Sequence, residues 1–489
     1  MLSVVAGIKA AAERNAFAPA LITGARLVTY GELLGVVARV SNHLADRGLR
    51  PGTKVFLNIG DADFRLTVIV ACLHCGLIPF IFENIAGAGD DIDHDLVIGA
   101  EVLWSPDLKP DIVIGQSVLS GGGSDPKLRE FPDRGPEEVL FVGSTTGTTG
   151  RPKLVAETAG AFDRKRALRV PPRGGSIRTA MLNTSDRFLS TLGDLTKYGF
   201  SLGLQALMAG ATHVRSLRDF GDLLKLINIV GVTTMMTTPD VASALMDRMD
   251  DLPARCPSVR WIGLSGSLFH RALIDRLEHR FPGATLAVLY GTAEVGRITA
   301  GTVTSADFEV GYVGELHPEV RVASTGTRAD PQPITILNSP DRHSPRYVRG
   351  KLIPVAEATY TLPDLGFLEG PHLYLVGRDD EVFNADGNKT AFSIIEGDLR
   401  AAPGVTDVGI VAGNLVGDFL GLVVAVAGAG PLDVAALADR VAICARAPGL
   451  RRRIHLFQIA SVPRNATGKI DRNAIARAYR LAAEPVSSV

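Results

Sequence analysis

The chain has 489 residues, of which 46% are hydrophobic and 21% are charged, and it contains 52 glycines and 28 prolines. This composition is typical of a globular protein with many turns and excludes a disordered, collagenous or coiled-coil chain. Because 51 Lys and Arg residues balance 52 Asp and Glu residues, no overall field draws the chain to nucleic acid or to an anionic membrane. We therefore expect its partners to be recognised locally, with no role for nucleic acid.

Neither a membrane span nor an export signal is predicted. The longest uncharged run, residues 66–82, is broken by His74, Gly76 and Pro79, and it is interpreted as a helix followed by a buried strand. Charged residues interrupt the only candidate signal region near the N-terminus. Four cysteines in so long a chain do not make a disulfide framework and suit a reducing compartment, so a cytoplasmic location is expected.

The first half of the chain alternates helical and strand-like segments. A capping box of Thr29 and Glu32 begins an amphipathic helix that ends near Gly48. A strand-like run at residues 54–59 follows, and the alternation continues as far as about residue 236. This pattern indicates doubly wound α/β layers.

From about residue 311 the pattern changes. Short strand-like runs such as residues 333–337, separated by Pro, Gly and Asp, predict a mostly antiparallel section. After Gly377 the chain has its own pattern of strand-like runs and a closing helix at residues 471–483. This last part predicts a small α+β domain.

The most informative segment is a loop rich in Gly, Ser and Thr. Residues 141–154 read FVGSTTGTTGRPKL, so a hydrophobic strand end leads into small and hydroxyl residues and then into Arg151 and Lys153. Glycines let the backbone approach a ligand with its N–H groups turned outward, and the hydroxyls and cations add donors and charge. The loop therefore suits phosphate. A Walker A loop is excluded by its spacing, and a plain linker seldom ends in a basic segment.

Three further segments carry polar groups. Residues 290–294, YGTAE, offer an aromatic plane and a carboxylate after a hydrophobic strand end. Residues 373–387, LYLVGRDDEVFNADG, follow Asp364 at the expected domain boundary, and residues 463–472, PRNATGKIDR, place a Gly-Lys pair before the last helix. Taken singly, each of the three is more often structural than functional.

In their order along the chain, the four segments resemble the adenylate-forming superfamily of acyl-CoA synthetases, adenylation domains, luciferases and stand-alone amide bond synthetases. The resemblance covers nearly the whole chain. It implies an α/β fold in which a large N-terminal domain, residues 1–377, has two α/β layers and a small β-barrel. A smaller, mobile α+β domain, residues 378–489, would complete the fold.

The resemblance also implies an ATP-dependent ligase that uses Mg²⁺ to convert a small carboxylic acid to acyl-AMP and pyrophosphate, and then transfers the acyl group. The residues implied for ATP are Thr145, Thr146, Thr148 and Lys153 at the phosphates, Ser265, Gly266 and Tyr290 at adenine, Thr292 at phosphate, and Asp364 and Arg378 at the ribose. Glu294 would hold Mg²⁺, and Asp380 would mark the hinge. Lys469 would bridge the acid and the α-phosphate and stabilise charge during attack.

The acid-binding region is matched to residues 189–214. No Asp lies where amino-acid-activating relatives hold an α-ammonium group, so a free α-amino acid is not expected as the substrate. The side chains of the predicted pocket favour a flat or polar-substituted acid of the aryl or heteroaryl class. The predicted pocket residues are Lys197 and Tyr198 on one wall and Met235, Met236 and Thr237 on the other.

The acyl acceptor is expected to be an amine, with CoA or a carrier-protein thiol as the alternative. Residues 386–388, Asp-Gly-Asn, lack the Gly-Gly-Glu often found in CoA ligases that the chain resembles. Asp194 would take the proton from an attacking amine. A degenerate protein that binds nucleotide without catalysis is the non-enzyme alternative, and the presence of Lys469 and Glu294 argues against it.

Overall fold

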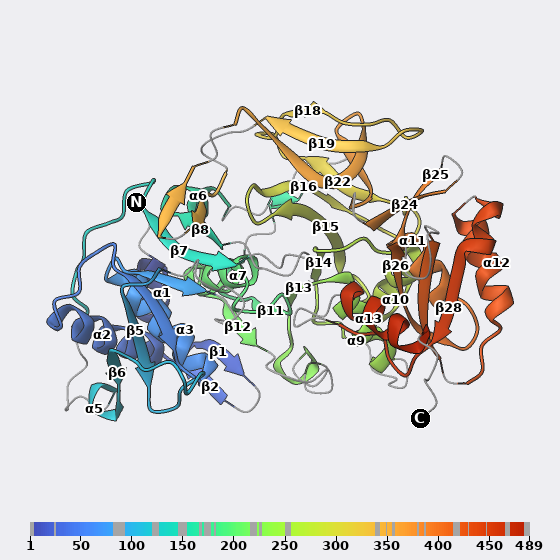
Figure 1. The fold of residues 1–489 in the computed structure, drawn as a ribbon. Coiled ribbons are helices and arrows are strands. Elements are labelled where there is room, and N and C mark those ends of the chain that lie inside the picture. Colours follow the sequence, from blue (N-terminus) through green and yellow to red (C-terminus); the bar gives the residue numbers. More distant parts are fainter. Residues whose placement is uncertain are drawn as a thin grey trace, which may run out of the picture.

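The computed structural model describes residues 4–23, 26–81, 93–119, 127–144, 154–165, 169–170, 178–179, 182–215, 223, 227–249, 256–337, 343–348, 350–354, 357–378, 381–385, 388–413, 421–428, 430–445, 447–464 and 470–483. Figure 1 shows an N-terminal α/β part, a central sheet with an antiparallel extension above it, and a C-terminal part at the far side.

The longest sheet has thirteen strands among the described residues, in the order β18-β19-β22-β23-β17-β16-β15-β14-β13-β11-β12-β1-β2. One half of this sheet consists of seven strands: β1 (Pro19–Thr23), β2 (Arg26–Thr29), β11 (Arg187–Ser190), β12 (Thr212–Arg215), β13 (Thr234–Thr237), β14 (Trp261–Leu264) and β15 (Thr285–Thr292). Apart from the edge strand β2, these strands run parallel.

The rest of this sheet is antiparallel, as the change of pattern near residue 311 predicts. Its strands are β16 (Gly296–Thr302), β17 (Tyr312–Leu316), β18 (Val322–Ser324), β19 (Gln332–Leu337), β22 (Thr359–Glu369) and β23 (His372–Arg378). They pack around buried Ile298, Ile334, Leu362 and Leu373. This section occupies the place where a small barrel was expected.

A second sheet has eight strands in the described part of the chain, in the order β21-β20-β8-β7-β4-β3-β5-β6. They are β3 (Lys54–Asn58), β4 (Ile78–Ile81), β5 (Leu96–Ala100), β6 (Ile112–Ile114), β7 (Val139–Ser144), β8 (Leu154–Thr158), β20 (Arg346–Val348) and β21 (Lys351–Ile353). Five neighbouring strands of this sheet, β7-β4-β3-β5-β6, are parallel. Two further strands, β9 (Arg169–Val170) and β10 (Arg178–Thr179), pair with each other.

Helices cover these sheets, several of them with a hydrophobic face. The helices of this part are α1 (Val4–Arg14), α2 (Tyr30–Asp46), α3 (Ala62–His74), α5 (Gln116–Leu119), α6 (Ala159–Lys165), α7 (Lys197–Ala209), α9 (Pro239–Met249) and α10 (Arg271–Arg280). The predicted capping box of Thr29 and Glu32 begins α2, and its Leu33, Val37 and Leu44 are buried. No helix in the described ranges is long and apolar enough to cross a membrane.

Helix α7 lies between the two large sheets. It contacts β7 of the second sheet on one side and β11 and β12 of the long sheet on the other (Figure 1). Residues from Gly199 to Met208 are buried along its whole circumference, as is expected of a helix without a solvent face. Thr196 caps its N-terminus by accepting a hydrogen bond from the Gly199 amide.

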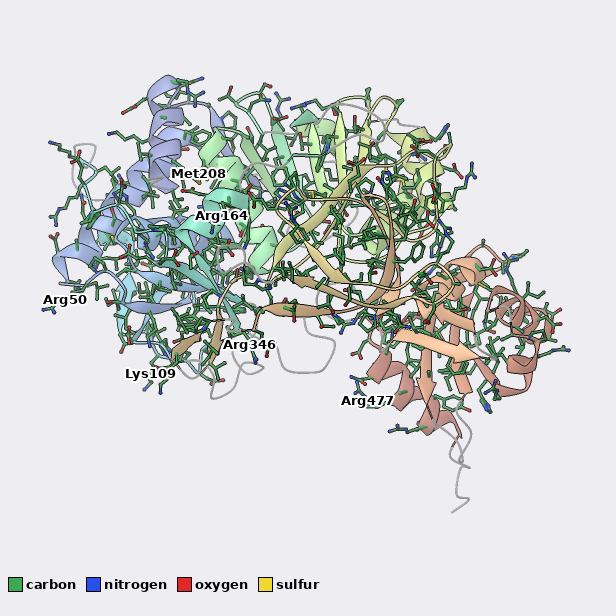
Figure 2. The ribbon with its side chains drawn as sticks, turned by 90° about the horizontal axis from the view of Figure 1, so that it is seen from above. Arg50, Lys109, Arg164, Met208, Arg346 and Arg477 are labelled. Carbon is green, nitrogen blue, oxygen red and sulfur yellow. The ribbon has the colours of Figure 1, made fainter. Side chains whose placement is uncertain are left out.

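The C-terminal part has its own sheet and core. Its elements are β24 (Val382–Ala385), β25 (Asn388–Ala391), α11 (Phe392–Arg400), β26 (Val405–Gly413), β27 (Gly421–Gly428), α12 (Val434–Cys444), the 3₁₀ helix η3 (Pro448–Arg453), β28 (Ile454–Gln458) and α13 (Arg472–Ala483). Buried Ile395, Ile410, Val424 and Val441 belong to one cluster. Figure 2 shows this part, with Arg477, at the opposite end of the molecule from Arg50. The fold class is therefore as predicted: α/β layers, an antiparallel section and a smaller α+β part.

The close packing of α7 generates a prediction for two helical glycines. A Cβ at Gly203 would lie 2.6 Å from the Cε1 atom of buried His213 on β12. We expect Gly203→Ala to lower the free energy of unfolding by about 1–3 kcal/mol, because the helix and the strand must separate. Gly35→Ala in α2 is the control, since its Cβ would meet only the flexible Arg39 side chain at 3.6 Å.

Chemical denaturation of the wild type, Gly203→Ala and Gly35→Ala measures these changes in the free energy of unfolding. The Gly35→Ala variant should be neutral or more stable by up to about 1 kcal/mol, because alanine is the better helix former. Equal effects at both positions would contradict the account of α7 packing.

Candidate functional site

A cavity lies where the strand order of the long sheet reverses. From β11 the chain passes through α7 to β12 on one side, and the next strand, β13, pairs on the other side of β11. Ligands of doubly wound sheets bind outside the carboxyl ends of the strands at such a switch point. Thr191 follows β11, Thr238 follows β13 and Ser265 follows β14, and all three line the cavity.

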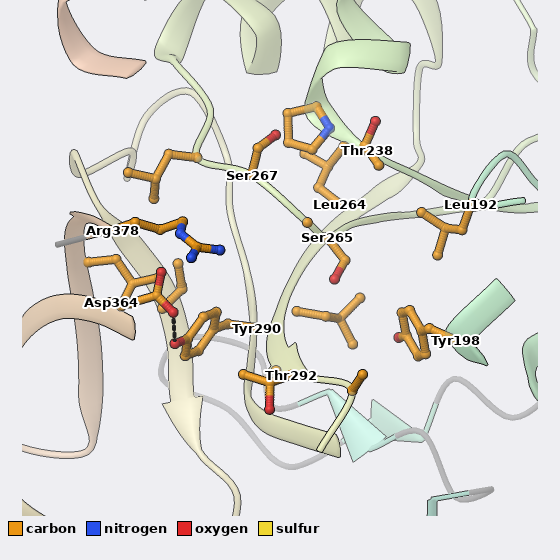
Figure 3. Close-up of a pocket in the computed structure, with 18 of the residues that line it drawn as sticks. Leu192, Tyr198, Thr238, Leu264, Ser265, Ser267, Tyr290, Thr292, Asp364 and Arg378 are labelled. Atoms are coloured by element: carbon orange, nitrogen blue, oxygen red, sulfur yellow. Dashed lines mark hydrogen bonds between the residues drawn. The ribbon is translucent and has the colours of Figure 1, made fainter. Parts of the chain in front are cut away.

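The cavity gathers most of the predicted residues that the structure describes. Its volume is about 1390 Å³, compared with roughly 300–1,000 Å³ for a site that holds one small ligand. The predicted residues that line it are Lys197, Tyr198, Ser265, Gly266, Tyr290, Thr292, Glu294, Asp364 and Arg378. Figure 3 shows Asp364 and Arg378 at one end, Tyr198 and Leu192 at the other, and Ser265 and Thr292 between them.

The polar end is built by two adjacent antiparallel strands. Asp364 on β22 and Arg378 on β23 are register partners, which is why residues fourteen positions apart in the sequence meet here. The Tyr290 hydroxyl donates to the Asp364 carboxylate at 2.6 Å (Figure 3). Burial and the Asp364 charge raise the pKa of Tyr290 well above its usual value, so the phenol stays protonated and fixes the carboxylate.

A buried charge network lies behind the loop that carries Glu294. The Lys197 ammonium contacts the Glu157 carboxylate at 2.7 Å, the Ala293 carbonyl at 2.7 Å and the Ser344 hydroxyl at 2.6 Å. Lys165 reaches both Glu157 oxygens at 2.9 Å. The Ser344 amide donates to the Glu294 carbonyl at 2.7 Å. The network therefore ties β8, α6 and α7 to the backbone on both sides of the Glu294 side chain.

The protonation states of this network follow from burial and pairing. Glu157 is 1% exposed, and the two ammonium groups lower its pKa to about 2 even though burial opposes ionisation. Burial lowers the pKa of Lys197 to about 8, while Glu157 opposes that shift. Lys197 was predicted to face the acid as a wall of the pocket. The structure instead engages its ammonium with protein acceptors.

The opposite wall of the predicted acid pocket needs correction. Met235 and Met236 lie within β13, are fully buried and belong to the hydrophobic clusters on the two faces of the sheet. Thr237 is 1% exposed and bonds to the Thr191 hydroxyl at 2.9 Å. None of the three lines the cavity. Since the cavity lies beyond the carboxyl end of β13, the next residues, Thr238 and Pro239, line it instead.

The predicted role of Asp194 as a base also conflicts with its surroundings. Its carboxylate accepts from the Arg215 guanidinium at 2.6 Å, and Asp194 is not among the residues that line the cavity. Arg215 is 3% exposed and also pairs with Asp63 at the start of α3. The Asp194 carboxylate thus meets protein donors and does not face the cavity. Asp194 therefore joins α3, β12 and the loop after β11.

The C-terminal part closes one side of the cavity. Glu381, Phe392, Ile470 and Asp471 contribute to the lining. Arg472 anchors this side, because its guanidinium contacts Glu396 at 2.6 Å, Glu381 at 3.2 Å and the Ile410 carbonyl at 2.7 Å. The sequence singled out this segment for Lys469 and missed Arg472. The predicted residues Thr145, Thr146, Thr148, Lys153, Asp380 and Lys469 lie outside the described residues.

Comparisons with known proteins find a matching family and similar folds. Residues 92–353 match the family described as AMP-binding enzyme. The chain is 24% identical over 507 residues to 4-chlorobenzoate–CoA ligase of an Arthrobacter species. The matched region covers 93% of this chain and 90% of that relative.

Two solved structures share the fold. One is the anthranilate CoA ligase AuaEII in complex with anthranoyl-AMP, with a TM-score of 0.79, 16% identity and coverage of 99% of this chain and 98% of the other. The second is O-succinylbenzoate CoA synthetase (MenE) from Bacillus subtilis in complex with ATP and magnesium ion, with a TM-score of 0.73, 19% identity and coverage of 96% and 98%.

The charge network predicts the effect of Glu157→Gln. This change leaves the Lys197 and Lys165 ammonium groups without their shared anion, so we expect the free energy of unfolding to fall by about 3–5 kcal/mol at neutral pH. Asp247→Asn is the control, because Asp247 pairs with Arg276 at the surface, where such a pair contributes at most about 1 kcal/mol.

The difference between the wild type and Glu157→Gln should also depend on pH. The pKa of Glu157 is lowered in the folded chain from 4.5 to about 2, so its contribution is complete above 4.5 and is lost as the pH falls toward 2. Denaturation curves of both proteins, measured across that pH interval, show whether the difference in the free energy of unfolding falls on acidification. A difference that grows on acidification would contradict the assigned ionic state.

Proposed function

The chain belongs to the AMP-binding enzyme family, whose match covers more than half of it, and is an ATP-dependent ligase that forms AMP; we propose that it activates an aromatic carboxylic acid and transfers the acyl group to a thiol. The observation that carries the proposal is one continuous cavity with a polar end and an apolar end. A nucleotide and an acid that occupy it together meet between Ser265 and Thr292, with their reacting atoms oriented.

The polar end fits the nucleotide. Asp364 offers carboxylate oxygens to vicinal ribose hydroxyls, and Arg378 adds donors beside it. Tyr290 presents a ring to the cavity whose orientation is set by its bond to Asp364, which suits stacking against adenine. Ser265 and Gly266 at the end of β14 would complete the base pocket.

Glu294 fits Mg²⁺ that arrives with ATP. Magnesium is usually held by one or two carboxylates and by substrate phosphates. Among the described residues, no group of three or more His, Cys, Asp or Glu side chains could hold a metal ion. The remaining ligands would be phosphate oxygens of ATP and water. The bound ion would neutralise phosphate charge. The Lys197 network would hold the Glu294 backbone in place.

The apolar end fits a flat acid. Tyr198, Leu192, Leu202 and Leu289 line it, and the nearby Lys197 ammonium is paired with the Glu157 carboxylate. An aromatic ring gains from burial in such a pocket and from contact with the Tyr198 ring. The names of the three compared proteins each contain an aromatic acid, which supports the same class of substrate.

The chemistry would proceed in two steps. An acid oxygen attacks the α-phosphorus of ATP, the bond to pyrophosphate breaks, and the acyl-AMP remains. A nucleophile then attacks the acyl carbon and AMP leaves. We propose that Thr145, Thr146, Thr148 and Lys153 bind the phosphates and that Lys469 stabilises charge in the first step. Ile470 and Asp471, which directly follow Lys469, line the cavity.

We further propose that residues 1–377 and 378–489 are two domains and that the second turns about Asp380 between the steps. The C-terminal part lines the cavity through residues such as Glu381 and Phe392. A rotation of this part would therefore change the lining without disturbing the polar end formed by β22 and β23.

A thiol is preferred as the acceptor because the three compared proteins are named for CoA and because Asp194, the residue that favoured an amine, is held by Arg215. An amine is the second candidate. It is favoured by residues 386–388, which read Asp-Gly-Asn. These two acceptors give different products, so one experiment separates them.

The experiment supplies ATP, Mg²⁺ and benzoic, hydroxybenzoic, aminobenzoic or fatty acids, with no acceptor, with CoA or with simple amines, and identifies products by mass. We expect pyrophosphate release with aromatic acids and an acyl-CoA product. Lys469→Ala should lower the adenylation rate by ~10²–10³-fold while ATP still binds. An amide instead of a thioester would establish the second candidate. Turnover of fatty acids alone would contradict the aromatic substrate, and undiminished turnover by Lys469→Ala would remove its role.

A further inference from the structure

One buried polar side chain in the cavity has no protein partner among the described residues. Glu157, Lys197 and Glu396 are ion-paired, Ser201 donates to the Lys197 carbonyl, and Thr238 accepts from the Val241 amide. Gln205 lines the same cavity, is 7% exposed and makes no hydrogen bond within the described part of the chain. Its amide is therefore available to a ligand in the cavity.

Helix α7 places Gln205 at the far end of the acid pocket. Tyr198, Leu202 and Gln205 follow at helical spacing on the face that borders the cavity, and Gln205 is the last residue of α7 in the lining. Gln205 lies seven positions after Tyr198 in the helix, which corresponds to about 10 Å along the axis. The far end is otherwise apolar, with Leu202 and Leu289 in one hydrophobic cluster with Phe188 and Trp261.

An unpaired amide in such surroundings selects its ligand. A plain aromatic ring that covers Gln205 removes the amide from water and returns no hydrogen bond, whereas a ring that carries a hydroxyl or amino group pairs with it. Gln can donate and accept, so either kind of substituent is satisfied. Lys197 does not compete for this role, because its ammonium already has three protein acceptors.

We propose that Gln205 is a specificity-determining residue that selects aromatic acids bearing a hydrogen-bonding group on the ring edge remote from the carboxylate. This rests on the proposed function. The carboxylate must lie between Ser265 and Thr292 to react (Figure 3). Because Gln205 lies beyond Tyr198 along α7, the opposite edge of the ring is the part that reaches toward Gln205. Hydroxyl or amino groups at ring positions 3 or 4 fit this description, and benzoic acid itself does not.

The test measures kcat/KM for acid-dependent pyrophosphate release by the wild type and by Gln205→Met, which keeps the length of the side chain and removes its donors and acceptor. The acids are benzoic, 3- and 4-hydroxybenzoic, and 3- and 4-aminobenzoic acid. We expect the wild type to prefer at least one substituted acid over benzoic acid by about ten- to a hundredfold. In Gln205→Met this preference should fall to about threefold or less, with the rate for benzoic acid maintained or raised.

Ser201→Ala is the matched control, because Ser201 lies one turn away on α7 and its hydroxyl already bonds to the Lys197 carbonyl. Its preference among the acids should stay that of the wild type. A wild type that prefers benzoic acid, or a Gln205→Met variant that keeps the wild-type preference while turning over benzoic acid, overturns the assignment of Gln205 and leaves the proposed function intact. If no aromatic acid releases pyrophosphate with the wild type, the proposed function fails and the selection by Gln205 fails with it.

Discussion

The site depends on the parallel pairing of β11 with both β12 and β13. This pairing reverses the strand order, sends α7 between the two large sheets, and leaves the carboxyl ends of β11, β13 and β14 facing one cavity. Backbone hydrogen bonds fix the strand ends, so the side chains that follow them are positioned by the sheet. The antiparallel pair β22 and β23 then brings Asp364 opposite Arg378 at the rim. The polar end of the cavity is thus set by sheet register.

Charge burial is the second constraint, because α7 and the loop with Glu294 meet where water is excluded. A lone Lys197 ammonium there would be costly, and Glu157 offsets that cost only because Lys165 and Ser344 complete the coordination of its carboxylate. The resulting network is bonded on one side to the Ala293 carbonyl and on the other to Ser344, whose amide holds Glu294. Stability and the position of a candidate metal ligand therefore depend on the same contacts.

Sequence patterns predicted correctly the features that depend on neighbouring residues, such as helix caps and strand segments. The capping box of α2 and the change to antiparallel strands near residue 311 are present, and the polar residues of the YGTAE segment lie in one cavity with Asp364 and Arg378. The acid pocket was predicted less well. Whether Met236 or Thr238 lines a cavity depends on where β13 ends, and the partner of Lys197 is forty residues away in an apolar run. Gln205 sits in a helix that is buried all round, so helical periodicity gives no sign that one of its faces borders a cavity.

The central claim is that one cavity holds the nucleotide and the aromatic acid at the same time. Calorimetric titration with a hydrolysis-resistant 4-hydroxybenzoyl-adenylate analogue, beside AMP and 4-hydroxybenzoate alone, tests it most directly. If both ends are occupied together, the analogue should bind at least ~100-fold more tightly than AMP, because the second contact is made without a second loss of translational freedom. An analogue that binds no more tightly than AMP would contradict the account.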